Sequence, residues 1–189
     1  MLSSAADTYL ASLDRITPVS TAHVERVLID EGADPWPAWL AFHERYAGYV
    51  QPIALDRAVW GIVHVRSHWI MEGRCAVVDQ GQATETVCCA DVHPSYAYEL
   101  DRQGLFSGGP ADSFDVYVEQ LAAWWHFVGK SYRPRRLWSV TDPAWTHIIR
   151  TQAERVDRAS DSFHEVFSSD RIHAVWDIEL ERWDTILTR

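Results

Sequence analysis

The chain has 189 residues, of which 47% are hydrophobic and 23% charged, and it carries a formal net charge of -10. A chain of this length and composition is expected to form one globular domain with a good core, and its acidity excludes a protein that binds the phosphate backbone of nucleic acids. No stretch approaches the ~18 consecutive apolar residues of a membrane span, and residues 1–13 lack the basic start and apolar centre of an export signal. We therefore expect a cytoplasmic protein with no membrane and no nucleic-acid partner.

Three short helices are predicted before residue 50. Apolar residues recur at helical spacing from Ser4 to Leu13, and a second helix begins at Thr21 and stops at Gly32. A third helix follows the proline-rich sequence 34–37 and ends at Gly48. Proline at the entry of a helix and glycine just past its end are typical of helix boundaries.

The middle of the chain predicts strands. Runs rich in Val, Ile and Trp occupy residues 59–65, 68–78 and 84–92, and residues 96–106 predict a hairpin whose turn is Asp101-Arg102-Gln103-Gly104. Together these segments predict one central antiparallel sheet of about four to six strands. Because helices come first and last with the sheet between them, the predicted fold class is α+β.

A long helix is predicted near residues 113–128. Asp112 and Ser113 are both suitable as its N-cap, because either side chain can accept a hydrogen bond from the first free amides. The helix has a single apolar stripe that should face the core, formed by Phe114, Tyr117, Val118, Leu121, Trp125 and Val128.

Residues 130–189 form a C-terminal extension to a predicted core of about 20–129, within one domain that spans the whole chain. Asp142-Pro143 predicts the start of a helix, and residues 162–167 fit one or two further helical turns. Residues 172–180 alternate as in a strand. The spacing of Trp183, Ile186 and Leu187 fits a helix equally well, so the pattern leaves the end of the chain open.

The histidines and cysteines raise the hypothesis of a metal-dependent hydrolase. His64 and His68 precede Cys75, and Cys88-Cys89 follows. Neighbouring side chains of a strand point to opposite faces, so the cysteine pair cannot enter one tetrahedral site without a bulge, and neither an HExxH nor a GxSxG motif occurs. We therefore expect reduced thiols, no metal, no cofactor and no catalytic residues, with the hydrolase as the alternative.

Three segments resemble the SUKH superfamily, which includes regulators of yeast cell-wall assembly and bacterial immunity proteins. They are the aromatic-rich helix 37–48 (PAWLAFHERYAG), the hairpin 98–104 (YELDRQG) and the Ser-Phe start of the long helix at 113–117 (SFDVY). Their order and spacing agree with the family over roughly residues 20–129. The resemblance implies a non-catalytic α+β domain that binds a toxin of the same cell and blocks its active site. A SUKH-like regulatory scaffold unrelated to toxins is the second role it implies.

The acidic residues suggest where such a partner would bind. Three of them lie on the long helix opposite its apolar stripe, and three more lie on the predicted strands and hairpin turn, so together they could meet Lys and Arg of a basic toxin domain. A merely solvated helix face is the alternative. Trp36, flanked by prolines, is the tryptophan that we expect to be exposed as an interface anchor. The predicted partner-binding residues are Asp91, Glu99, Asp101, Asp112, Asp115, Glu119 and Trp36.

Overall fold

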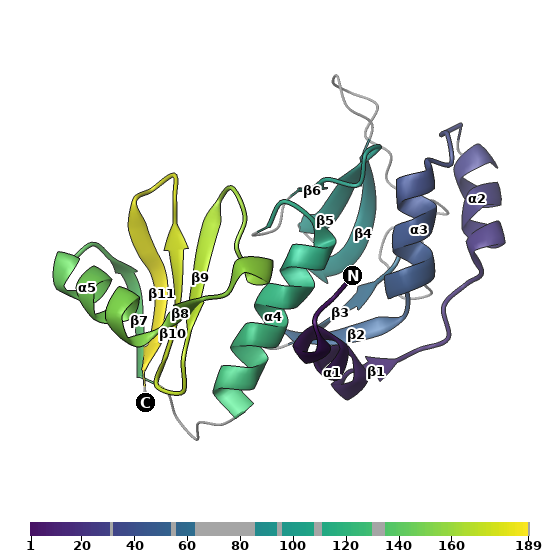
Figure 1. The fold of residues 1–189 in the computed structure, drawn as a ribbon. Coiled ribbons are helices and arrows are strands. Elements are labelled where there is room, and N and C mark those ends of the chain that lie inside the picture. The colour runs from purple at the N-terminus through teal and green to yellow at the C-terminus, as the bar shows by residue number, and fades with distance from the viewer. Residues whose placement is uncertain are drawn as a thin grey trace. The chain divides into compact units, whose positions relative to one another are not determined.

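The computed structural model describes residues 1–30, 32–53, 56–62, 86–93, 96–107, 111–129 and 135–188. The chain forms two compact units: an N-terminal unit, Leu13–Gly109, and a C-terminal unit, in which Met1–Ser12 joins Pro110–Arg189. The described residues contain five α-helices and two antiparallel sheets, so the α+β prediction is confirmed (Figure 1). The predicted core of about 20–129 includes residues of both units.

The sheet of the N-terminal unit has six strands in chain order, each antiparallel to the next. The predicted strands 59–65 and 84–92 overlap two of them, whereas the predicted strand 68–78 lies outside the described residues. The strand Tyr49–Ile53, which begins before Pro52, was not predicted. The six strands are β1 (Asp14–Arg15), β2 (Tyr49–Ile53), β3 (Asp56–Trp60), β4 (Thr86–His93), β5 (Tyr96–Asp101) and β6 (Phe106–Ser107).

The predicted turn between β5 and β6 is confirmed. A side-chain oxygen of Asp101 accepts hydrogen bonds from the backbone amides of Gln103 and Leu105, both at 2.8 Å. Gly104 has a φ of 86°, a left-handed conformation that glycine adopts without a steric penalty. The turn therefore follows from local sequence alone.

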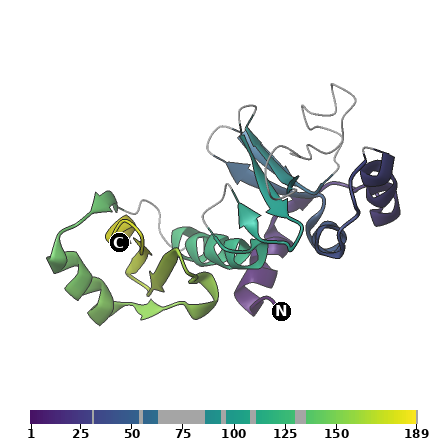
Figure 2. The ribbon, with the colours of Figure 1, turned by 90° about the horizontal axis from the view of Figure 1, so that it is seen from above.

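Helices α2 (Thr21–Asp30) and α3 (Pro37–Tyr46) complete the N-terminal unit and lie side by side (Figure 2). The indole nitrogen of Trp39 donates to the Asp101 carbonyl at 2.6 Å, which fixes α3 against the end of β5. Gly48, just after α3, has a φ of 86°, and a Cβ atom at this position would lie 2.3 Å from the Ile16 carbonyl oxygen. Only glycine fits there, which explains why the helix ends where the sequence predicted.

The C-terminal unit contains the second sheet, whose strand order is β7-β11-β10-β9-β8. Helix α5 (Pro143–Gln152) covers one face of this sheet, around a core of Ile149, Phe167, Ile172, Ala174, Trp183 and Ile186. Helix α4 (Phe114–Gly129) contacts β9 and β10 and also α1 (Ser4–Ser12), while η2 (Asp157–Ala159) is a short 3-10 helix beside it. The strands are β7 (Arg135–Val140), β8 (Glu154–Arg155), β9 (His164–Ser168), β10 (Ile172–Asp177) and β11 (Arg182–Thr188).

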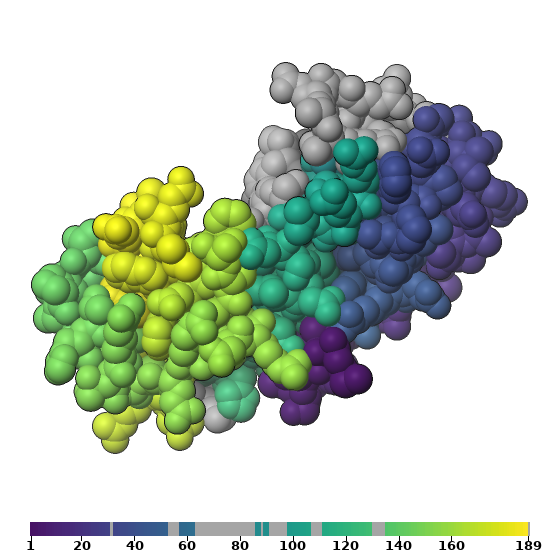
Figure 3. All heavy atoms as spheres, turned by 45° about the horizontal axis from the view of Figure 1, so that its top comes forward, coloured from purple at the N-terminus to yellow at the C-terminus, as the bar shows by residue number. Residues whose placement is uncertain are grey.

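The N-terminal residues complete this unit. In Figure 3 the dark purple atoms of the first residues lie against yellow-green atoms of the C-terminal unit. There the Arg158 guanidinium donates to the Met1 carbonyl at 2.7 Å. A segment from the start of the chain therefore packs with its last third, which no sequence pattern indicated.

The C-terminal predictions have mixed outcomes. Asp142 caps α5 by accepting from the Ala144 amide at 2.9 Å, as expected. The helical turns predicted for 162–167 are wrong, because most of this segment is β9, which pairs with both β8 and β10. The open ending is resolved as a strand: Trp176 pairs with Trp183 and Val175 with Thr185, so Asp184 is an extra residue in β11. This bulge turns Trp183 and Ile186 to the same core, which imitates a helical spacing.

The long helix begins and ends almost where predicted, and Ser113 is its N-cap, since its hydroxyl accepts from the Val116 amide at 3.3 Å. The predicted stripe is only partly correct. Leu121 is half-buried and Trp125 is 36% exposed, and α4 is contacted on two sides rather than one. The buried residues of α4 are Phe114, Tyr117, Val118, Glu119, Ala122 and Phe127.

Candidate protein-binding surface

The prediction that Glu119 lies on a solvated helix face is wrong. Glu119 is only 7% exposed, and its two carboxylate oxygens accept hydrogen bonds of 2.6 Å from the amide and the hydroxyl of Ser3. The Ser3 hydroxyl also accepts from the Ala6 amide at 3.1 Å and so caps α1. The physical reason for the error is that α1 covers this side of α4 from 116 residues away.

Asp112 and Asp115 belong to the same unit as Glu119 and lie at the start of α4. The Asp112 carboxylate accepts from the Ser162 amide at 3.0 Å and from the Ser162 hydroxyl at 2.9 Å. The Asp112 amide in turn donates to an Asp161 carboxylate oxygen at 3.0 Å. Asp115 is half-buried in the first turn of the helix. Asp112 thus joins the start of α4 to the loop that precedes β9.

The other predicted partner-binding residues lie in the N-terminal unit. Glu99 accepts from the Thr86 hydroxyl at 2.9 Å, and Asp101 holds the β5–β6 turn. Asp91 pairs with Val59 and Ala97 in the sheet, and its side chain lies outside the described residues. These contacts give Glu99 and Asp101 structural roles.

Trp36 is half-buried, so the prediction that it is exposed is wrong. It occupies the N-cap position of α3, and the Arg102 guanidinium carbon lies 5.9 Å from its ring centroid. Arg102 belongs to the β5–β6 turn. The turn thus contacts Trp36, whose flanking prolines had led to the prediction of an exposed side chain.

An exposed apolar and acidic surface, which we call the hairpin tip, lies at one end of the C-terminal sheet. Phe163 is 49%, Ile178 40% and Leu180 53% exposed. The Ile178 amide donates to the Phe163 carbonyl at 2.9 Å, so the β10–β11 turn lies beside the start of β9. The exposed Glu179 and Glu181 separate the apolar residues of the turn. The hairpin tip is defined as Phe163, Ile178, Glu179, Leu180 and Glu181.

The conformation of the β10–β11 turn is set by specific contacts. The Leu180 amide donates to the Asp177 carboxylate at 2.9 Å, and Glu181 has a φ of 48°. A non-glycine residue in this left-handed region costs free energy and is uncommon outside turns. The turn therefore presents its side chains from a defined backbone, and Figure 3 shows its yellow atoms projecting from this unit.

The hairpin tip is linked to the predicted acidic start of α4. Asp112 binds Ser162, and Phe163 is the next residue. The signal for this surface was present in the sequence as Ile178-Glu179-Leu180-Glu181, where apolar and acidic residues alternate. The alternation predicts a strand, whereas the segment forms the turn after β10 and exposes both kinds of side chain.

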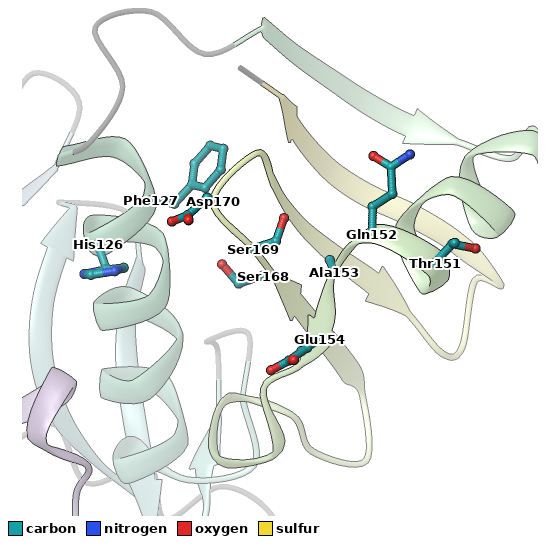
Figure 4. Close-up of a pocket in the computed structure, with 9 residues that line it drawn as sticks. All are labelled: His126, Phe127, Thr151, Gln152, Ala153, Glu154, Ser168, Ser169 and Asp170. Atoms are coloured by element: carbon teal, nitrogen blue, oxygen red, sulfur yellow. The ribbon is translucent and has the colours of Figure 1, made fainter.

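A cavity of about 530 Å³ in the C-terminal unit offers a second candidate site (Figure 4). Two of its hydroxyls have structural hydrogen bonds: Ser169 accepts from the Ile172 amide at 3.1 Å, and Thr151 donates to the His147 carbonyl at 2.6 Å. In Figure 4 the His126 imidazole lies apart from both serine hydroxyls. The cavity is lined by His126, Phe127, Thr151, Gln152, Ala153, Glu154, Ser168, Ser169 and Asp170.

The cavity does not hold the geometry of a nucleophile activated by a base. Such a pair needs the two side chains within hydrogen-bond reach, about 2.6–3.2 Å apart. Within the described residues no hydrogen bond joins His126 to Ser168 or Ser169. The arrangement therefore gives no chemical reason to place an acyl-transfer or hydrolytic site there.

Among the described residues, each unit buries one histidine in its core. The Nε2 atom of His43 lies 2.9 Å from the Val19 carbonyl, and its Nδ1 atom accepts from the Ile62 amide at 3.2 Å, which assigns the proton to Nε2. Burial lowers the pKa of His43, opposed by its bond to Val19. Burial also lowers the pKa of His173 to about 4. The His173 ring centroid lies 5.9 Å from that of Phe127 on α4. Both imidazoles are neutral core residues at neutral pH.

The residues of the hydrolase hypothesis fall mostly outside the described part of the chain. This holds for His64, His68 and Cys75 and for the side chain of Cys88. Cys89 is buried in β4. Among the residues that the structure describes, no three His, Cys, Asp or Glu side chains are grouped closely enough to hold a metal ion.

Comparisons of the chain with models of known protein families, with curated proteins and with solved structures find no match. Within the described ranges, none of the helices has the length and apolar character needed to cross a lipid bilayer.

Proposed function

We propose that this protein is a non-catalytic, immunity-type protein that binds a basic toxin domain in the cytoplasm and neutralises it sterically. The observation that carries the proposal is the hairpin tip, which exposes three large apolar side chains and two glutamates next to one another. Apolar anchors surrounded by charged residues are the usual composition of a protein-binding surface. The partner's matching surface would be an apolar depression with a rim of Lys and Arg.

Isolated exposed apolar residues are normal on protein surfaces and need no function. The hairpin tip differs in two respects. Its apolar residues are neighbours, because Ile178 is hydrogen-bonded to Phe163, and the turn holds Glu181 at a φ of 48°. The net charge of -10 and the SUKH resemblance support the same partner class.

The hairpin tip takes the place of the acidic helix face as the proposed main contact with the partner. Glu119 is buried and Asp112 is hydrogen-bonded to Ser162, so neither is free to meet a partner's cation without breaking a structural contact. Asp115 lies in the same unit and would contribute to long-range attraction. A SUKH-like scaffold would use the same type of surface with a partner that is not a toxin.

The test takes a basic toxin domain that binds the wild-type chain, sought first among the products of neighbouring reading frames, and co-expresses it with variants of this chain. Ile178→Ser combined with Leu180→Ser should weaken binding at least 30-fold, since truncated anchors typically cost 2 kcal/mol or more, roughly 30-fold in affinity. It should also abolish protection of the cells. Glu179→Lys combined with Glu181→Lys should slow association about tenfold at low salt and change dissociation less.

The control is Glu154→Lys, a charge reversal at an exposed position of the same unit that is separate from the hairpin tip. Circular dichroism melts would establish that each variant keeps its fold. If the serine variant protects cells as well as the wild type does, the hairpin tip is not the contact surface and the proposal fails.

A further inference from the structure

The strands at the edges of the two sheets differ in length. Among the described residues there are four such strands, and three of them, β1, β6 and β8, contain two residues each. Very short edge strands protect a sheet from pairing with other chains. The fourth, β7, has six residues and is the outermost strand of its sheet, next to β11 (Figure 1). Its outer backbone groups therefore offer a template for a further strand.

The first two side chains of β7 are basic. Arg135 and Arg136 are both exposed, and neither forms an ion pair within the ranges that the structure describes. On the opposite edge of the same sheet, Arg155 of β8 is paired with Asp157 at 2.6 Å and with Glu165 at 3.3 Å. The start of β7 is thus a local basic patch on a chain whose net charge is -10.

Trp138 adds an aromatic ring to this patch. It is 59% exposed, and the Arg136 guanidinium carbon lies 4.3 Å from its ring centroid. The two residues are two positions apart, so they lie on the same face of the strand, while Leu137 packs against the core on the other face. Ser139 has a φ of 51°, which ends the extended conformation. We call residues 135–138 the β7 edge.

We infer that the β7 edge binds an extended acidic segment of a protein, which adds a strand to the C-terminal sheet. Main-chain hydrogen bonds hold a segment bound in this way, and its side chains give the specificity. Opposite charges directly across two strands stabilise their pairing and like charges oppose it. Arg135 and Arg136 therefore select two adjacent carboxylates and reject a basic segment, and an apolar residue of the segment would lie beside Trp138.

This binding partner differs from the basic domain proposed for the hairpin tip. No residue of the hairpin tip belongs to β7, so either surface can be altered without changing the residues of the other. Loss of peptide binding at the β7 edge would leave the immunity proposal intact, and the converse also holds.

The probes are two fluorescein-labelled peptides, Ser-Thr-Val-Thr-Val-Glu-Glu-Ser and its reverse, Ser-Glu-Glu-Val-Thr-Val-Thr-Ser, titrated into the full chain. They place the glutamates opposite the arginines in antiparallel and parallel pairing. Fluorescence anisotropy should show saturable binding of one of them. Replacing its glutamates by lysines should weaken binding at least tenfold, and methylating the four central backbone nitrogens should do the same, because it removes main-chain donors and keeps the side chains.

Variants of the chain assign the binding to the β7 edge. Arg136→Glu should remove the preference for the glutamate peptide over the lysine peptide. Trp138→Thr, which keeps a strand-forming residue at this exposed position, should weaken binding at least threefold. Arg171→Glu is the matched control: it changes the net charge equally at an exposed position before β10, and the affinity should stay within about twofold of the wild type. Circular dichroism checks the fold of each variant.

Several results would overturn the inference. They are the absence of saturable binding of both peptides, equal affinities for the glutamate and lysine peptides, and undiminished binding of the methylated peptide. A wild-type chain that sediments as a dimer and becomes monomeric in Trp138→Thr would also overturn it, because a second copy of the chain would then occupy the β7 edge.

Discussion

The two units each contain a histidine with less than 3% of its surface exposed, and the two imidazoles differ in their hydrogen bonds. His43 in the N-terminal unit is 1% exposed and has hydrogen bonds at both ring nitrogens. His173 in the C-terminal unit is 2% exposed, and its Nδ1 atom has no hydrogen-bond partner within the described residues. The first histidine joins two segments of backbone, whereas the second packs against a phenylalanine ring.

This difference indicates which interactions stabilise the core around each histidine. The carbonyl of Val19 and the amide of Ile62 are backbone groups that would be left without a partner in the absence of His43. An unsatisfied buried group costs about 1–3 kcal/mol, while replacing a poorly bonded polar group by an apolar one of the same shape can be neutral or stabilising. The surroundings of His43 thus depend on specific polar contacts, and those of His173 depend mainly on packing.

The largest effect is expected from Gly48→Ala in the N-terminal unit. The new Cβ atom would lie 2.3 Å from the Ile16 carbonyl oxygen at a φ of 86°, so the backbone must shift. We expect a loss of about 3–5 kcal/mol in the free energy of unfolding. Hydrogen exchange with mass spectrometry should show faster exchange in peptides from residues 43–60.

Gly32→Ala is the matched control for Gly48→Ala. It has a similar φ of 81°, but nothing lies within 4 Å of its Cβ position. It should therefore cost only the conformational strain, about 1 kcal/mol. Equal losses for the two variants would show that the contact with Ile16 is not what requires glycine after α3.

The next effect is a pH dependence of stability. The pKa of His173 falls from 6.5 to about 4 on folding, so between these values the unfolded chain binds a proton that the folded chain does not. The free energy of unfolding should therefore decrease as the pH falls from 6.5 to 4, by up to about 3 kcal/mol from this residue. His43 acts in the same direction, because burial lowers its pKa too.

Urea denaturation between pH 7 and pH 4 measures this dependence. His173→Phe should remove part of the decrease and leave the part that belongs to His43 and to the carboxylates. An unchanged pH profile in His173→Phe would show that the imidazole of His173 is not held neutral by the fold.

The smallest expected effect is a difference in the free energy of unfolding at neutral pH between variants of the two histidines. His43→Phe should lower the free energy of unfolding by about 2 kcal/mol, since it leaves Val19 and Ile62 without their partner. His173→Phe should change it by less than about 1 kcal/mol in either direction, since its Nδ1 atom has no bond to lose. Urea denaturation at pH 7.5 compares the two, and equal losses would contradict the distinction between the cores.

Several elements follow from residues that are near one another in the chain. The bounds of α4, the Asp101 turn and the Asp142 cap each depend on contacts within about one helical turn, and all were predicted. The α+β class follows in the same way, from the order in which helical and strand periodicities occur. Local propensity and capping act at short range, so a single sequence is enough to reveal them.

Contacts between distant segments decided the rest. Ser3 covers Glu119, Arg102 reaches Trp36, and the bulge at Asp184 gives β11 a spacing like that of a helix. The hairpin tip exposes its apolar residues because β10 ends at Asp177 and the chain turns there, although the alternation of side chains continues. Whether a carboxylate is a contact residue or a buried hydrogen-bond acceptor depends on which segment packs over it. The residue pattern of a helix shows which face is polar, but only the packed chain shows what covers that face.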